Sequence, residues 1–141
     1  MKFGVFYQLP CAVDQTPAAR YQDTIAQCQL ADELGFDAAW LAELHFNPSF
    51  SVMPAPLMIA SAIAQTTKNI RIGNAVNLLP LHQPVRLAEE VATLDVLSNG
   101  RVNVGVGAGW LREEFETLGL PPFDERGAVT DEYIRAFKEL W

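Results

Sequence analysis

The stretch from residue 70 to residue 106, IRIGNAVNLLPLHQPVRLAEEVATLDVLSNGRVNVGV, decides the fold, because it holds a strand, a helix and a second strand in succession. Its two ends, Ile70–Val76 and Val102–Val106, are short runs rich in β-branched residues, as strands are. The helical pattern between them begins near Pro84 and ends at Ser98-Asn99-Gly100, with three residues on its apolar face: Leu87, Val91 and Leu94. This succession predicts two parallel strands joined by a crossover helix.

The same unit repeats toward the amino terminus. Two more β-rich runs, Phe3–Tyr7 and Ala38–Ala42, place the strand starts about 30 residues apart, the length of a strand-plus-helix unit. All four runs are apolar on both faces, which predicts buried strands. Thr16-Pro17 and Gly35 delimit a first helix. Three further groups of residues carry the remaining helical patterns: Tyr21, Ile25, Cys28 and Leu34 in the first helix, Leu57 to Ala64 in the second, and Tyr133, Ile134, Phe137, Leu140 and Trp141 in a fourth.

Alternating strands and helices predict an α/β protein with a parallel sheet and right-handed crossovers. A small doubly wound sheet and half of a (β/α)₈ TIM-type barrel, which needs about 250 residues, both have this order. The sequence stops at Leu140-Trp141 inside an apolar helical stripe. We therefore expect residues 1–141 to be the N-terminal half of a barrel domain, a truncated chain or fragment with only the first four β/α units.

The composition excludes several classes of function. Seventeen acidic and ten basic residues give a net charge of −7, which disfavours binding to nucleic acid. No apolar run approaches the roughly 20 residues of a membrane helix, and Gln8 and Pro10 interrupt the first apolar run too early for a signal peptide. Cys11 and Cys28 have no metal-binding or redox spacing. We expect a cytoplasmic protein without a metal site or a membrane partner.

Ligands of parallel α/β proteins bind beyond the carboxyl ends of the strands. The second strand is followed there by Glu43 and His45, a carboxylate beside an imidazole that can exchange a proton near neutral pH. We predict these two residues as catalytic. His82 precedes a helix start and is expected in a surface or capping role, and Glu113-Glu114 is expected on a solvated helix face.

The ends of the third and fourth strands are candidates for cofactor binding. Asn74 and Asn77 bring amides that can both donate to and accept from a heterocycle. Gly107 and Gly109 allow the backbone to approach a flat or anionic ligand, whereas Gly105, inside its strand, is expected to make room for a neighbour. Trp110 stands where a dinucleotide fingerprint has its third glycine, so that motif is absent.

Two groups of residues give the sequence a family resemblance. The first spans the second strand and the residues on either side of it: Gly35-Phe36-Asp37, Trp40-Leu41, Glu43 and His45-Phe46. The second spans the third helix: Leu79-Pro80, Pro84-Val85-Arg86, Ala88-Glu89-Glu90, Leu94-Asp95, Leu97-Ser98 and Gly100-Arg101. In these residues the chain resembles the bacterial-luciferase-like flavin-dependent monooxygenases, whose members are more than twice as long.

The resemblance implies a (β/α)₈ barrel that uses reduced FMN and oxygen to oxygenate a small organic substrate. It also implies a cis peptide between Ala75 and Val76. The implied cofactor-binding residues lie at the ends of the third and fourth strands: Ala75, Val76, Asn77, Gly107, Ala108, Gly109 and Trp110. Family members often dimerise, so we expect a homo- or heterodimer at full length, and the fragment alone is expected to be inactive.

Three positions depart from luciferase. Leu44 stands where luciferase has its catalytic histidine, and His45 matches the second of two adjacent histidines. Because successive strand residues face opposite ways, His45 is not a simple replacement. Ala108 replaces an arginine that meets the flavin phosphate, and Gly107 replaces a cysteine beside the flavin. Phosphate binding is therefore expected from backbone amides and from the second half of the barrel.

Two alternatives to an FMN-dependent monooxygenase remain open. The run from Gly105 to Phe115, with Leu118-Gly119 and Arg126-Gly127, resembles the branch of the superfamily that uses a reduced deazaflavin coenzyme for hydride transfer. A non-catalytic companion subunit is the other alternative, because Leu44 replaces the catalytic histidine.

Overall fold

The computed structural model describes all 141 residues and contains one four-stranded parallel sheet. Its strands are β1 (Gly4–Tyr7), β2 (Ala38–Leu41), β3 (Arg71–Leu78) and β4 (Val102–Gly107). They lie side by side in chain order, and each pairs in parallel with the next. A doubly wound sheet would reverse its strand order at a switch point. The sequential order therefore confirms the predicted arrangement of a half-barrel.

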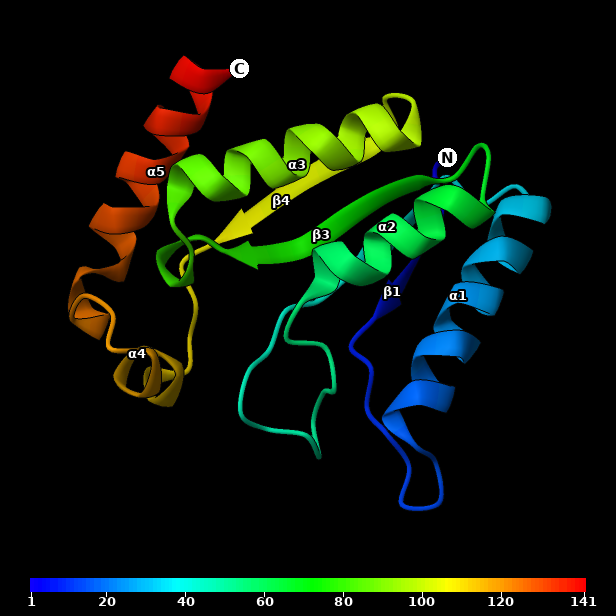
Figure 1. Cartoon of the computed structure of the whole chain (residues 1–141), viewed down its shortest axis with the longest axis horizontal. Helices are drawn as coiled ribbons and strands as arrows, with labels where there is room; N and C mark the ends of the chain where they lie inside the picture. The colour runs from blue at the N-terminus through cyan, green and yellow to red at the C-terminus, as the bar shows by residue number, and fades with distance from the viewer.

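A helix follows each of the first three strands, and two follow the fourth. These helices are α1 (Pro17–Glu33), α2 (Pro56–Thr66), α3 (Pro84–Ser98), α4 (Arg112–Leu118) and α5 (Arg126–Leu140). Two short 3₁₀ turns, η1 (Leu79–Leu81) and η2 (Phe123–Glu125), connect them. The sequence delimited only one helical region after β4, the one that carries Tyr133 to Trp141, and α4 is the separate short helix that holds Glu113-Glu114. Figure 1 shows β3 and β4 running side by side toward the end of the molecule where α4 lies.

The helix boundaries follow from local chemistry. Thr16 caps α1 by accepting the N–H of Ala19 at 3.1 Å, as predicted, and proline takes an early position in the helix. Gln83, the residue after His82, caps α3 by accepting the N–H of Arg86 at 2.7 Å. At the other end of α3, Asn99 adopts a left-handed φ of 59° and closes the helix. No helix is long and apolar enough to span a membrane.

Helices α1, α2 and α3 cover one face of the sheet. The core residues there come from both layers: Ala39, Leu41, Ile70 and Ile72 from the sheet side, and Cys28, Ala31, Ala60, Ile63, Ala64 and Leu94 from the helices. Leu34, placed in the α1 stripe by the sequence, is exposed instead because the helix ends beside it.

The opposite face of the sheet carries no helix. Phe6 of β1 is 57% exposed there, and the Trp40 ring packs directly on Gly73 of the neighbouring strand. The prediction that all four strands are buried therefore holds for the central strands β2 and β3 and is wrong for the edge strands. β1 and β4 each have a neighbour on one side only.

The carboxyl half of β3 is irregular. Its register with β4 shifts between Asn74 and Asn77, and a cis peptide joins Ala75 to Val76 at the bond that the resemblance implied. A Cβ on Gly105 would overlap the backbone oxygen of Asn74, so the glycine lets the two strands approach there. This confirms the predicted role of Gly105 as space for a neighbour.

Candidate active site at the carboxyl ends of the strands

Glu43 lies just beyond β2 at the centre of a polar cluster. The alternation that places Ala39 and Leu41 against the helices continues to Glu43 and buries its side chain completely. Its Oε2 accepts the backbone N–H of Leu78 at 2.9 Å, which ties the end of β2 to the end of β3. Its Oε1 faces two imidazole rings, those of His45 and His82.

His45 turns back onto Glu43. Its Nε2 lies 3.0 Å from Oε1 of Glu43, and its side chain is 17% exposed. Phe46 follows with a left-handed φ of 57°, a conformation that bulky residues rarely adopt and that reverses the chain at this point. The structure therefore brings together the two residues predicted as catalytic.

Electrostatics favour an ion pair between Glu43 and His45. Burial alone would raise the pKa of Glu43, but hydrogen bonds from His45, His82 and Leu78, with the charge of His82, hold it below the usual value of 4.5. The hydrogen bond to Glu43 raises the pKa of His45 above 6.5, against the opposing effect of burial. Glu43 is thus a carboxylate at neutral pH, and His45 is held closer to its protonated form.

Glu114 of α4 also belongs to the cluster, although the sequence led us to expect it on a solvated helix face. That expectation is wrong, because Glu114 is fully buried and its Oε1 accepts the backbone N–H of His45 at 2.8 Å. Its Oε2 is buried without a hydrogen-bond partner. Burial raises the pKa of Glu114, with the nearby Glu43 charge in the same direction and the His45 contact opposing it.

His82 is the second correction. Its Nε2 lies 2.7 Å from Oε1 of Glu43, so it belongs to the cluster, while Gln83 supplies the helix cap. His82 and Glu43 are 39 residues apart in the sequence, and they meet because the ends of β2 and β3 lie side by side. A signal existed in the sequence, because His82 follows a strand end just as His45 does.

A surface groove of about 900 Å³ runs between α2 and α3 and reaches this cluster. Asn77 and His82 lie among its lining residues, and the helices contribute Leu57, Met58, Glu89 and Leu97. Asn77 is 1% exposed and donates from Nδ2 to the carbonyl of Gly105 at 3.2 Å. One of its amide donors is therefore occupied within the sheet.

The predicted cofactor residues form two adjacent backbone segments. β3 and β4 pair Leu78 with Gly107, and a Cβ on Gly107 would meet Val76 Cγ2 at 2.5 Å. Gly109 has a left-handed φ of 80° and Trp110 is 66% exposed, so the loop after β4 offers open backbone and an aromatic ring. The side-chain cluster and these segments are linked through α4, where Glu114 holds His45.

These segments fit the ring of a flavin better than its phosphate. Half-buried backbone and an exposed aromatic side chain suit a flat heterocycle. Ala108 itself carries no charge, and two arginines close to this loop make contacts within the chain: Arg112 pairs with Asp124 at 3.1 Å, and Arg126 donates to the carbonyls of Gly109 and Phe123. No group of side chains is arranged to hold a metal ion.

Four parallel strands in sequence order, with acid and imidazole groups gathered at their carboxyl ends, define a protein of the (β/α)₈-barrel class. Within that class the chain belongs to the luciferase-like monooxygenase family, whose model matches residues 1–141.

Relatives of known description include both monooxygenases and a dehydrogenase. The oxygenase component of a flavin-dependent trigonelline monooxygenase from Acinetobacter baylyi is 34% identical over 144 residues, which cover 100% of this chain and 39% of the relative. A monooxygenase from Streptomyces bottropensis superposes with a TM-score of 0.95 at 30% identity, over 100% of this chain and 43% of that one. An F420-dependent secondary alcohol dehydrogenase, in complex with an F420–acetone adduct, gives a TM-score of 0.80 at 27% identity, over 99% and 42%.

The chain thus spans about two-fifths of the length of these relatives. Family membership confirms the resemblance drawn from the sequence. Of the relatives named above, one is described as flavin-dependent and one as F420-dependent.

Proposed function

We propose that this chain forms part of an FMN-dependent monooxygenase that uses oxygen to oxygenate a small organic substrate. The observation that carries the proposal is His45 held against the buried carboxylate of Glu43 at the carboxyl edge of the sheet. Support also comes from the two monooxygenases among the relatives. Two unpaired cysteines agree with a reducing compartment such as the cytoplasm.

In this proposal His45 takes or gives the proton, and Glu43 orients its ring and stabilises its protonated form. Reduced FMN supplies the oxygen chemistry when bound. Backbone from Ala75 to Asn77 and from Gly107 to Trp110 would hold the flavin ring, and its phosphate would bind to β/α units beyond these four. Those units complete the barrel, because β1 and β4 both leave an edge unpaired.

A deazaflavin-dependent reductase or dehydrogenase is the second candidate. The observation that favours it is the similarity to the F420-dependent alcohol dehydrogenase, together with Ala108 in place of a phosphate-binding arginine. Hydride transfer by such an enzyme would need no oxygen.

Parallel titrations of the full-length protein with reduced FMN and with a reduced deazaflavin test the proposal. Substrate-dependent oxygen uptake with FMN is the expected result. Oxidation of the deazaflavin without oxygen uptake would replace it with the second candidate. If neither coenzyme binds, the companion-subunit alternative takes its place.

A further inference from the structure

One carboxylate oxygen connects two imidazole rings in this cluster. Oε1 of Glu43 lies 3.0 Å from Nε2 of His45 and 2.7 Å from Nε2 of His82. Orienting His45 requires only one of these contacts, so the second histidine needs another explanation. A continuous chain from imidazole to carboxylate to imidazole is an arrangement along which a proton can move.

The two ends of this chain differ in their surroundings. The Glu43 side chain has no exposed surface, whereas His45 is 17% and His82 is 27% exposed. His82 lines the groove between α2 and α3, while His45 is held by α4 through Glu114. The buried carboxylate therefore lies between His45 and a more exposed imidazole, His82, which lines the α2–α3 groove.

We propose that His82 is the outer end of a proton relay that connects His45 to water in the α2–α3 groove. In the outward direction the Nε2–H bond of the His45 imidazolium breaks and an O–H bond forms at Oε1 of Glu43. The proton passes to Nε2 of His82 when this ring is in the tautomer that carries its hydrogen on Nδ1, and Nδ1 then releases that hydrogen to water. The inward direction reverses these steps, and no electrons are transferred.

The charged groups around each ring are few. Glu43 and Glu114 face His45. Glu43 faces His82, and the groove beside it is lined by Arg86, Glu89 and Glu90. Arg86 pairs with Glu89 at 2.8 Å, so the paired charges near the outer end largely cancel. The inference rests on the proposed role of His45 in proton transfer, but the relay itself needs no flavin.

Residues 1–141 contain two histidines, His45 and His82, and in the full-length protein His45→Gln and His82→Gln identify their ring signals. With ¹⁵N-labelled histidine, exchange of the His45 Nε2 proton with water can be followed by NMR in the absence of any coenzyme. His82→Gln keeps a hydrogen-bond donor but cannot titrate, and it should slow this exchange by about tenfold or more. Glu90→Gln, which changes the groove without touching Glu43, is the matched control and should leave the exchange unchanged.

A second variant covers the case in which His82→Gln does not fold. His82→Ala opens space for added imidazole, which should restore exchange at His45 toward the rate of the parent protein. Unchanged exchange in His82→Gln, or no rescue of His82→Ala, would overturn the relay. These results are independent of the proposed function, which fails separately if neither coenzyme binds.

Discussion

At Glu43 a fully buried carboxylate faces two imidazole nitrogens and accepts one backbone N–H. Glu43→Gln removes the charge but keeps the shape, and it turns one acceptor of the cluster into a donor. We expect the free energy of unfolding to fall by about 3 kcal/mol, as for other broken buried ion pairs. Chemical denaturation measures the loss. Glu113→Gln, an exposed change on α4, is the control, and its free energy of unfolding should stay within about 0.5 kcal/mol of that of the parent. An equal loss in both variants would contradict the prediction.

The pH dependence of stability follows from three shifted groups. The lowered pKa of Glu43 gives a contribution that is present above its unfolded value of 4.5 and is lost as pH falls. The raised pKa of His45 gives one that is present below 6.5 and is lost as pH rises. The raised pKa of Glu114 acts in the same sense as that of His45. The Glu114 contribution begins to be lost above about pH 4.5 and the His45 contribution above about pH 6.5. Thermal melts should therefore show highest stability near pH 5 and a decline that becomes steeper above about pH 6.5.

His45→Gln provides the control for this profile. This variant should lose less stability on the alkaline side than the parent does. The loss that Glu114 causes should remain. A stability maximum above pH 8, or an alkaline decline that His45→Gln does not alter, would show that the cluster does not govern the profile.

His45 also carries the catalytic prediction for the full-length protein. If it transfers a proton beside the flavin, His45→Ala should lower the rate of the chemical step by roughly 10²-fold. Flavin affinity should change little, because the coenzyme is held mainly by other residues. Turnover per bound flavin, measured beside a thermal melt, separates this from a loss of folded protein. Normal turnover in a destabilised variant would remove His45 from the catalytic residues.

Leu44→His is the complementary variant, since it restores the adjacent pair of histidines found in luciferase. It should increase oxygenation in an FMN-dependent enzyme. No increase, with FMN still bound, would count against a luciferase-like register at this strand end.

At the scale of elements, β4 lies close against the irregular part of β3. A methyl group on Gly105 would overlap the carbonyl oxygen of Asn74, and backbone atoms cannot move aside as a flexible side chain can. Gly105→Ala should therefore lower the free energy of unfolding by about 3 kcal/mol. Gly127→Ala, in α5 with no atom within 4 Å of the added methyl, should have no cost. Equal stability of the two variants in denaturant would contradict the assigned contact.

Strands and long helices were predictable from the sequence because their signals are local. Apolar runs gave β1 to β4 within two residues, and Thr16 and Pro84 marked two helix starts. Glu113-Glu114 was expected on a helix, but the bounds of α4 could not be predicted because it has only seven residues and no capping side chain before its first residue. A short element of this kind depends on tertiary contacts rather than on its own pattern.

The site was predictable only in part, for a related reason. Glu43 and His45 are two residues apart, so a strand end brings them together without knowledge of the fold. Glu114 contacts His45 across 69 residues and His82 contacts Glu43 across 39. Sequence position therefore gave no indication that Glu114 is buried, and a glutamate beside another glutamate on a helix is usually solvated.

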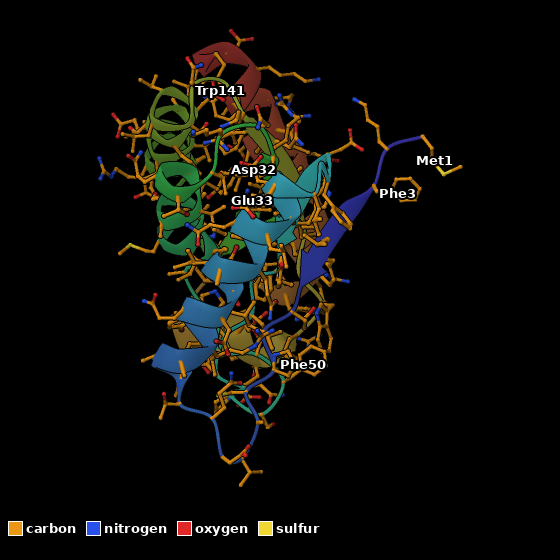
Figure 2. The ribbon with its side chains drawn as sticks, turned by 90° about the vertical axis from the view of Figure 1, so that its right-hand side faces the viewer. Met1, Phe3, Asp32, Glu33, Phe50 and Trp141 are labelled. Atoms are coloured by element: carbon orange, nitrogen blue, oxygen red, sulfur yellow. The ribbon has the colours of Figure 1, made fainter.

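For the whole molecule, the sheet separates a covered face from an open one. The amino-terminal and carboxyl-terminal ends of the strands also have different roles. Asp32, at the carboxyl end of α1, accepts three backbone N–H groups, from Lys68, Asn69 and Ile70, and so anchors the entry to β3. Figure 2 shows Phe50, in the loop after β2, toward the other end of α1 from Asp32 and Glu33. The Asp32 anchor thus lies at one end of the sheet and the candidate active site at the other.

The open face and the two unpaired edges predict self-association of the 141-residue chain. Unpaired backbone groups along β1 and β4 can pair with a second copy, and Phe6 presents a large apolar surface beside the β1 edge, 57% exposed. Lysine at an edge strand opposes such pairing. Phe6→Lys should therefore raise the concentration at which the chain associates by about tenfold or more, equivalent to about 1.4 kcal/mol.

Sedimentation velocity over a concentration series measures this shift, and Met58→Lys is the matched control. Met58 is 73% exposed on α2, beside the groove on the helical side of the sheet, so its replacement adds the same charge to a different surface. If the strand edges drive association, Met58→Lys should leave it unchanged. If Met58→Lys weakens association and Phe6→Lys does not, the copies meet through their helices, and the open edges must be protected in another way. A parent chain that stays monomeric at every concentration would contradict the edge argument itself, because an unpaired parallel sheet of this kind would then be stable alone.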